Sequence, residues 1–301
     1  MSGRRYEAGG VVFRKVILTG AALVGITAIS FPEALAGSND VTPQRFGQCV
    51  NDDAPPCAGV RLDEAGFRAF AQELGVATAS YAMQPAETLG LNGFGFSINY
   101  ASTSLSSDES YWQLGNANGD PQDAMPLLSL QMRKGLPFSL EVGATVGLVP
   151  NSEITVLGGE VKYALHEDTL RPVPDLAIRA WGNAMVGHRD LSLYNVGLDV
   201  IASVPIGIGG SVQLTPIIGY SFQAIFAKTG LIDATPGDPM PPLIGGSGYS
   251  NAPEFVFELD HAIVHRMFAG LRLSIAVVDL NFQASFLGGQ TTIAGGLGLS
   301  F

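Results

Sequence analysis

The last twelve residues, Gln290 to Phe301 (QTTIAGGLGLSF), constrain the fold of this chain more than any other stretch. Read in steps of two, one side carries Ile293, Gly295, Leu297, Leu299 and Phe301, and the other carries Thr292, Ala294, Gly296, Gly298 and Ser300. Side chains alternate between the two faces of a β-strand, so this pattern predicts a strand with one strongly apolar face. A globular domain seldom ends with its most apolar face on its last residue, whereas a strand that faces lipid presents apolar side chains up to the membrane rim.

This ending resembles the C-terminal signal of bacterial outer-membrane β-barrel proteins, in which a polar residue, a glycine, a hydrophobe and a final aromatic are read by the barrel-assembly machinery. Gly296, Leu299 and Phe301 stand at the matching positions, whereas Ala294 stands where that signal prefers a polar residue. The resemblance is to the class as a whole and covers Leu89 to Phe301. It implies location in the outer membrane of a Gram-negative envelope. It also implies outer-membrane lipid, lipopolysaccharide and the barrel-assembly machinery as partners.

The composition agrees with a membrane barrel. Hydrophobic residues make up 47% of the chain and charged residues only 14%, which is low for a soluble domain. After the first forty residues, no apolar run is long enough to cross a bilayer as a helix. An apolar excess without long helices predicts strands.

The first 36 residues are predicted to be a secretory signal peptide. Four basic residues precede an apolar run from Val16 to Phe31, and Ala34-Leu35-Ala36 offers small residues for cleavage. The alternative is an uncleaved anchor helix, but the run is shorter than the ~20 residues that a spanning helix needs. Removing this segment, with its four basic and two acidic residues, would leave 12 basic and 25 acidic residues, a formal charge of −13. Nucleic acid is therefore excluded as a partner.

Residues 37–88 are predicted to form a short periplasmic segment that precedes the barrel. Cys49 and Cys57 are the only cysteines, and export favours a disulfide between them. A metal-binding pair is the alternative, although no histidine lies nearby. The run from Leu62 to Leu74 has the spacing of one amphipathic helix. Such a helix either enters the barrel or covers its mouth as a plug, or it packs beside the barrel.

Residues 89–301 are predicted to fold into a closed antiparallel transmembrane β-barrel of about ten strands, within a range of 8–12. The expected strands are 94–100, 127–133, 138–149, 154–165, 175–187, 191–204, 211–226, 254–264, 270–286 and the terminal strand. A change of parity near Val277 and Val278 predicts a β-bulge, or else two shorter strands. Periplasmic turns of such barrels are short and external loops long. The long connections 101–125 and 228–253 therefore lie outside and the N-terminal segment lies in the periplasm.

Charged residues on the inward face are predicted to pair across neighbouring strands. Symmetric hairpins place Glu141 opposite Lys162 and Arg179 opposite Asp199, with Glu160 one diagonal step from Arg179. A turn at Arg266 would likewise place Asp260 opposite Arg272. The remaining polar and aromatic residues expected in the lumen are Trp181, Asn183, Asn195, Gln213 and Glu258.

These pairs favour a lumen that is largely filled by side chains, since a ten-stranded barrel is only slightly wider than eight-stranded ones with filled interiors. The expected function is structural, or the passage of a small solute or hydrophobic compound. The alternative is a narrow gated channel or transporter plugged by residues 37–88. A lipid hydrolase at the outer rim is the third class, for which only His188 lies at the right end. No serine arrangement supports it, so no catalytic, cofactor or metal residue is assigned.

Overall fold

The computed structural model describes residues 37–50, 60–167, 173–234 and 254–301. In this part of the chain, ten strands pair in order into a closed antiparallel barrel, because β15 pairs with β3 and β13 pairs with β10. The barrel strands are β3 (Phe94–Ser104), β4 (Ala124–Leu136), β5 (Leu140–Leu148), β6 (Thr155–His166), β7 (Asp175–Val186), β8 (Leu191–Ser203), β10 (Val212–Thr229), β13 (Glu258–Ile275), β14 (Val278–Leu287) and β15 (Gln290–Ser300). The predicted fold class and strand number are confirmed. The predicted signal peptide and Cys57 lie outside the described residues, so the leader and the disulfide remain predictions.

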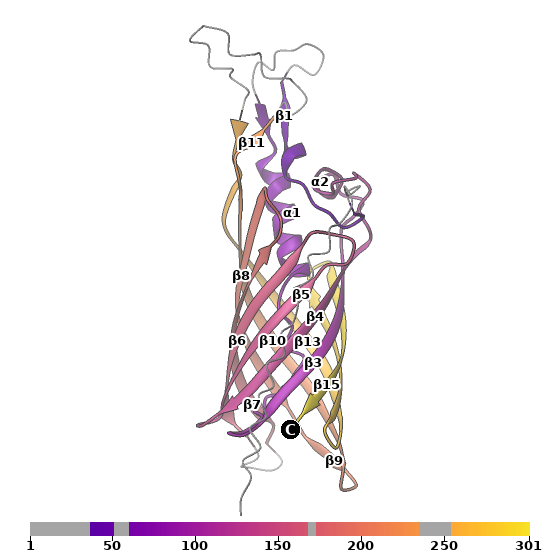
Figure 1. Ribbon diagram of the computed structural model, residues 1–301, viewed down its shortest axis with the longest axis vertical. Coiled ribbons are helices and arrows are strands. Elements are labelled where there is room, and N and C mark those ends of the chain that lie inside the picture. The colour runs from indigo at the N-terminus through magenta and orange to yellow at the C-terminus, as the bar shows by residue number, and fades with distance from the viewer. Residues whose placement is uncertain (1–36, 51–59, 168–172, 235–253) are drawn as a thin grey trace, which may run out of the picture. The chain divides into compact units, whose positions relative to one another are not determined.

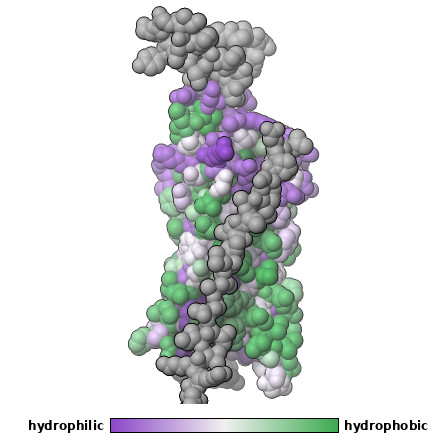
Figure 2. Space-filling view, viewed as in Figure 1, coloured by the Kyte–Doolittle hydropathy of each residue, from purple (hydrophilic) through white to green (hydrophobic). Residues whose placement is uncertain are grey.

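The outside of the barrel is covered by a belt of exposed apolar side chains, which we call the apolar belt. It includes Ile98, Leu130, Val161, Val196, Ile218, Met267, Phe282, Ile293 and Leu297, each about half exposed or more. Figure 2 shows hydrophobic residues spread over the barrel wall and hydrophilic residues gathered at the end that carries α2 (Ser110–Gly115). Monomeric soluble proteins rarely expose apolar patches of this extent. Among the described residues, no helix is long and apolar enough to cross a bilayer.

The two ends of the barrel differ. At one end lie the connection 105–123 and the described parts of the connection 230–257, and we call it the loop end. At the other end the connections are shorter, and Phe301 lies beside the first residue of β3; we call this the turn end (Figure 1). There Phe94 and Phe301 exchange two backbone hydrogen bonds, of 2.7 and 3.0 Å. These bonds complete the ring between β15 and β3.

The terminal strand places its apolar residues outward, as its alternation predicts. Leu299 and Phe301 are exposed on the barrel wall, and the Phe301 ring lies 6.2 Å from that of Phe96. Gly296 faces the lumen instead, where a Cβ atom would lie 2.2 Å from the Asn99 side-chain oxygen. The absence of a side chain at Gly296 leaves room for the Asn99 side chain, which would have to move if a Cβ atom were present.

The predicted pattern of the eighth and ninth strands is wrong in two places. At Asp260 and His261, two outward residues oppose the single residue Phe226, and this β-bulge shifts the parity of β13. The parity change near Val278 follows the second predicted alternative, a boundary between two strands: Ile275 of β13 pairs with Val278 of β14 across a tight turn in which Ala276 has a positive φ of 54°. The other departure from the prediction is the turn at Arg266. The turn that was expected at Arg266 does not exist, because β13 continues through it.

The N-terminal segment lies at the same end of the barrel as the long connections, whereas the sequence analysis places the two at opposite ends. The predicted helix is α1 (Glu64–Ala77), and its first turn is capped by Asp63, which accepts a hydrogen bond from the Gly66 amide. Before it come a 3₁₀ turn, η1 (Gln44–Phe46), and the paired strands β1 (Gly47–Cys49) and β2 (Val60–Leu62). All of them lie at the loop end, whereas the periplasmic prediction requires the turn end (Figure 1). The chain reaches β3 by passing down the lumen.

Candidate functional site

The candidate site is the lumen, which is occupied by the chain itself. The second half of α1 lies inside the loop end, and the residues that follow it, Thr78–Leu89, continue in a non-helical conformation towards the turn end. We call these residues the lumen segment. Nearly all of them up to Ala86 are buried. Side chains from the barrel wall bind this segment at three levels.

At the level nearest the turn end, Glu141 is the centre of an ion cluster. Its carboxylate lies 2.9 Å from Arg133 and 3.3 Å from Lys162, and all three side chains are almost fully buried. Glu141 also accepts a hydrogen bond from the Leu89 amide, at 3.0 Å. Lys162 donates to the carbonyls of Pro85 and Glu87, at 3.1 and 2.9 Å. The structure thus brings together the predicted pair Glu141 and Lys162, and it uses both residues to hold backbone.

At the middle level, Arg179 joins two carboxylates to the lumen segment. It donates to Glu160 at 2.8 Å and to Asp199 at 2.5 Å, and Trp181 donates to the same aspartate at 3.0 Å. The third nitrogen of Arg179 donates to the hydroxyl of Ser80. The predicted Arg179, Asp199 and Glu160 group therefore forms, because the hairpin of β7 and β8 has the expected register.

A second arginine acts at this level without a carboxylate of its own. Arg266 donates to the Ser80 carbonyl at 3.3 Å, and its guanidinium lies 4.9 Å from the centre of the Tyr81 ring. Its Nε and Nη1 atoms are buried and have no hydrogen-bond partner among the described residues.

At the level nearest the loop end, amides replace charges. Asn183 donates to the Thr78 carbonyl at 2.9 Å, and Asn195 donates to Asn183 at 2.8 Å. Gln223 donates to the carbonyl of Gly75, in the last turn of α1, at 3.0 Å. A Cβ atom on Gly75 would lie 2.5 Å from the Ile225 side chain, so the helix touches the wall.

The loop end is closed by an apolar cluster around α1. Phe70 and Leu74 of the helix are fully buried and belong to a core that includes Leu193 and Ile225 of the wall. The aromatic rings of this closure are Phe46, Phe67, Phe70, Trp112 and Phe257, which pack with centroid distances of 4.7–6.2 Å. Each fully buried side chain of this kind contributes about 1.5–3 kcal/mol.

Glu73 ties α1 to the connection 105–123. It accepts hydrogen bonds from the Ser106 amide and hydroxyl, the Tyr111 hydroxyl and the Trp112 indole, at 2.6–3.1 Å. Burial raises the pKa of the Tyr111 phenol, and the hydrogen bond to the Glu73 carboxylate raises it further. The connection is therefore fastened to the helix that it covers.

Two residues predicted for the lumen lie outside it. Asp260 and Glu258 are exposed, and Phe257 and Leu259 turn inward. Near the loop end, the inner face of the wall contacts the apolar closure and the outer face contacts water. The apolar residues therefore face inward and the charged residues outward, the opposite of the arrangement in the rest of the barrel. Arg272 does face the lumen, but it pairs with Asp279 at 2.8 Å, on the neighbouring strand β14, instead of with Asp260. Gln213 also faces inward and lies 3.4 Å from Glu87.

Sequence reasoning missed the functional roles of Arg133, Arg266 and Glu73, and above all the occupation of the lumen. A signal for it exists. Leu193, Ile225 and Leu127 lie on inward positions next to apolar outward neighbours, so these strands are apolar on both faces towards the loop end. A strand that is apolar on both faces needs something apolar to cover its inner side, and α1 provides it.

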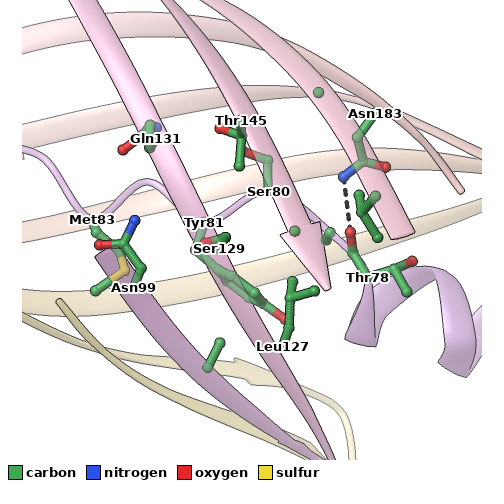
Figure 3. A pocket seen from close by; sticks show the side chains of 15 residues that line it. Thr78, Ser80, Tyr81, Met83, Asn99, Leu127, Ser129, Gln131, Thr145 and Asn183 are labelled. Atoms are coloured by element: carbon green, nitrogen blue, oxygen red, sulfur yellow. Dashed lines mark hydrogen bonds between the residues drawn. The ribbon is translucent and has the colours of Figure 1, made fainter. Parts of the chain in front are cut away.

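Little space remains beside the lumen segment. Figure 3 shows a cavity between residues 78–83 and the wall, where Asn183 bonds Thr78 and where Gln131 and Thr145 approach from the strands. Its volume is about 30 Å³, room for about two water molecules. This cavity is too small to be a wide path for a solute.

The histidine expected at the external rim is engaged by backbone. His188 Nδ1 accepts hydrogen bonds from the amides of Asp190 and Leu191, so its Nε2 carries the proton and donates to the Val41 carbonyl at 2.8 Å. Neither ring nitrogen is left to act as a base towards a serine. Across the described ranges, no group of three or more histidine, cysteine or acidic side chains is arranged to hold a metal ion.

No protein-family model and no curated protein matches the chain. The solved structures that resemble it are bacterial outer-membrane β-barrel proteins. Ail, the attachment invasion locus protein of Yersinia pestis, has 11% identity, and the match covers 70% of this chain and 99% of Ail with a TM-score of 0.27. The KdgM porin has 8% identity, with 68% and 99% covered and a TM-score of 0.31. LpxR from Salmonella typhimurium has 10% identity, with 67% and 99% covered and a TM-score of 0.30. Similarities this low carry no argument about function, which therefore rests on the lumen described above.

Proposed function

We propose that the protein is a structural barrel of the bacterial outer membrane, which its own N-terminal segment holds closed. The observation that carries the proposal is the lumen segment, which hydrogen bonds from wall side chains fix at three levels. An open pore has no need to fill its lumen with backbone.

The membrane location is supported by the apolar belt and by strand length. β3 and β15 have 11 residues each, and a tilted strand needs about 9–11 residues to cross the hydrocarbon core. A closed ring leaves no strand edge unpaired in lipid, where unsatisfied backbone groups are costly. The partners that follow are outer-membrane lipid, lipopolysaccharide and the barrel-assembly machinery.

The proposal that the barrel is closed is supported by the free energy needed to displace the lumen segment. Displacing the lumen segment would leave Glu141, Lys162 and Arg179 without several of their bonds, and each unmade bond to a buried polar group costs about 1–3 kcal/mol. The apolar contacts of α1 would be lost as well. These costs add up over the segment, so the closed state is the stable one.

Conductance in a planar lipid bilayer tests the proposal. We expect the full chain to show no conductance steps, and a deletion of residues 37–88 to show steps, because the deletion empties the lumen. A deletion of residues 37–63, which keeps α1 and the lumen segment, is the matched control and is expected to stay silent. Steps of equal size from the full chain and from the larger deletion would refute a closed barrel.

A second candidate function is a narrow passage for a small solute along β14 and β15. Among the described residues, no side chain of either strand forms a hydrogen bond with the lumen segment, whereas side chains of β5 to β8 do. A row across four strands carries Asn99, Gly296, Asn281 and Arg272. In it, Asn99 Oδ1, Arg272 Nε and both polar side-chain atoms of Asn281 are buried and find no hydrogen-bond partner within the described part of the chain. Buried polar atoms of this kind normally bond water, so this row marks where water or a solute would pass.

Asn281→Leu separates the two candidates. In vesicles that carry the full chain, a passage predicts uptake of small polar solutes, and this uptake falls in the variant because an apolar side chain replaces the unpartnered amide. A closed structural barrel predicts no uptake in either protein. Asn92→Ala, at an exposed position outside the strands, is the control.

A further inference from the structure

The feature that goes beyond a closed barrel is the direction in which the chain runs through it. Residues before α1 make contacts at the loop end with three separate connections of the barrel. Val41 forms a β-bridge with Asn116 of the connection 105–123. The Asn39 amide donates to the Asn151 carbonyl in the turn between β5 and β6, at 3.1 Å. His188, in the turn between β7 and β8, donates to Val41.

Arg45 adds a further anchor at the same end. Its guanidinium donates to the carbonyls of Gln113, Asn116 and Ala117, all in the connection 105–123. Asp40 accepts from the Glu153 amide at 2.9 Å. Residues 37–50 are thus fastened to the loop end at several independent points, and we call this fastened stretch, together with residues 60–63, the cap.

The following residues reach the opposite end. The fourteen residues of α1 rise about 21 Å at 1.5 Å per residue. The lumen segment, if fully extended, adds up to about 40 Å. Together they exceed the ~30 Å hydrocarbon core of a bilayer. At the turn end the Leu89 amide binds Glu141, and β3 begins a few residues later beside Phe301.

The path cannot lie outside the wall. The ring of ten strands is hydrogen-bonded throughout, including the pair of bonds between Phe94 and Phe301. The lumen segment is buried and is bonded from β5, β6, β7 and β8. The described N-terminal residues lie at the loop end, and the first barrel strand, β3, begins at the turn end. The chain has therefore passed through the ring of strands, or the ring has closed around it.

From this path we propose that the barrel delivers its own N-terminal segment to the cell surface, where the cap stays fastened over the loop end. The proposal rests on the proposed outer-membrane location, with the loop end outside because the two longest connections lie there. The segment has two consequences: it closes the lumen, and it presents the cap, residues 37–50 and 60–63, to the exterior. A signal peptide that is removed in the periplasm leaves an N-terminus that must then cross the membrane through the barrel.

Thiol labelling of intact cells tests the proposal. In the full chain carrying Cys49→Ser and Cys57→Ser, single cysteines are introduced by Gln48→Cys in the cap, Gly289→Cys in the loop-end turn of β14 and β15, and Ser211→Cys at the turn end. All three positions are exposed. The reagent is a maleimide that does not cross the outer membrane. We expect labelling of intact cells at positions 48 and 289, and labelling at position 211 only after permeabilisation.

The two reference positions separate failure of this inference from failure of the proposed function. If position 289 is labelled on intact cells and position 48 only after permeabilisation, the inference falls and the outer-membrane barrel stands. If position 211 is labelled on intact cells and position 289 is not, the proposed orientation is wrong.

A second measurement does not depend on removing the cysteines. An epitope tag is inserted between Ala36 and Gly37 in the otherwise unchanged chain, and the same tag is inserted between Gly209 and Gly210, where the turn-end hairpin has open space. Antibody binding to intact cells is expected at least tenfold higher for the first insertion than for the second. Equal binding, seen for both only after permeabilisation, would overturn surface delivery.

Discussion

The two halves of the lumen are enclosed by the same ten strands, but they are built from opposite chemistry. In the loop-end half the wall is apolar, with Leu193 and Ile225 packed on α1. In the turn-end half the wall carries buried ions such as Glu141 and Arg179 around an extended chain. The polarity of an inward side chain therefore does not follow from its facing the lumen alone. It follows from the structure that fills the lumen at that level.

The reason lies in the backbone of the filler. A helix bonds its own N–H and C=O groups, so its neighbours need only offer apolar contact. An extended segment has no such internal pairs, and leaving its groups unpaired in a dry interior costs several kcal/mol. The wall must then supply donors and acceptors, as Lys162 does for the carbonyls of Pro85 and Glu87. The wall amides begin where the helix ends: Gln223 donates to Gly75 in the last turn of α1, and Asn183 donates to Thr78, the first residue after it.

The largest expected effect comes from breaking the ionic half. Arg179→Met leaves Glu160 and Asp199 buried without their cation, and we expect the unfolding free energy to fall by about 3–5 kcal/mol in a urea titration in lipid vesicles. Arg61→Met, at an exposed arginine of β2, is the matched control and is expected to change it little. Adding Glu160→Gln and Asp199→Asn to the first variant should recover much of the loss. If the triple variant is as unstable as the single one, the charges are not the cause.

The next effect comes from the apolar half. Leu74→Ala removes a fully buried side chain of α1, and we expect a loss of about 3 kcal/mol in the same titration. Leu130→Ala removes the same atoms from the apolar belt, where the side chain is exposed, and it should cost much less. Equal losses would mean that α1 is not packed in the lumen.

A smaller change tests the boundary between the halves. Asn183→Ala removes the donor to the Thr78 carbonyl and a partner of Asn195, and we expect a loss of about 1–2 kcal/mol. In the bilayer, it should also produce brief conductance events that the full chain lacks, because the start of the lumen segment is loosened. An unchanged stability and a silent bilayer would show that this amide does not hold the segment.

The sequence predicts the wall of this barrel better than its content. The strands, the outward apolar faces and the Arg179 and Asp199 pair follow from alternation and short hairpins, which are local. The β-bulge at Asp260 could not be predicted from the sequence, because apolar and charged residues alternate in the same way before and after it. Before the bulge, however, the apolar Phe257 faces the lumen and the charged Glu258 faces outward. The path of residues 78–89 is not readable either, because the contacts of Ser80 or Pro85 are all with residues distant in the sequence. The alternation of the strand residues is the same in the sequence whether side chains or a segment of backbone fill the lumen.

The smallest effect concerns the turn-end anchor of the lumen segment, which lies beyond the strands. Glu167 accepts hydrogen bonds from the Thr88 amide and hydroxyl, at 2.9 and 3.0 Å. Burial raises the pKa of this carboxyl, but hydrogen bonds from Ser139 and Thr88 outweigh burial, so the pKa lies below its ordinary value. A lowered pKa in the folded state means that the anchor stabilises fully above the ordinary glutamate pKa of about 4.3. This stabilisation is lost as the pH falls through the lowered value.

Glu167→Gln should therefore reduce the unfolding free energy at pH 7 by less than about 1 kcal/mol, since the carboxylate is partly exposed to water. The difference from the unchanged chain should shrink below about pH 4 and vanish once both proteins carry a neutral group. Urea titrations between pH 3 and 7 measure it, with Glu153→Gln at the exposed loop-end turn as the control. A difference in unfolding free energy that stays constant over this range would mean that the charge of the Glu167 carboxylate does not contribute to the anchor. The turn-end half would then depend on the ion pairs inside the wall, those of Glu141, Arg179 and Arg272.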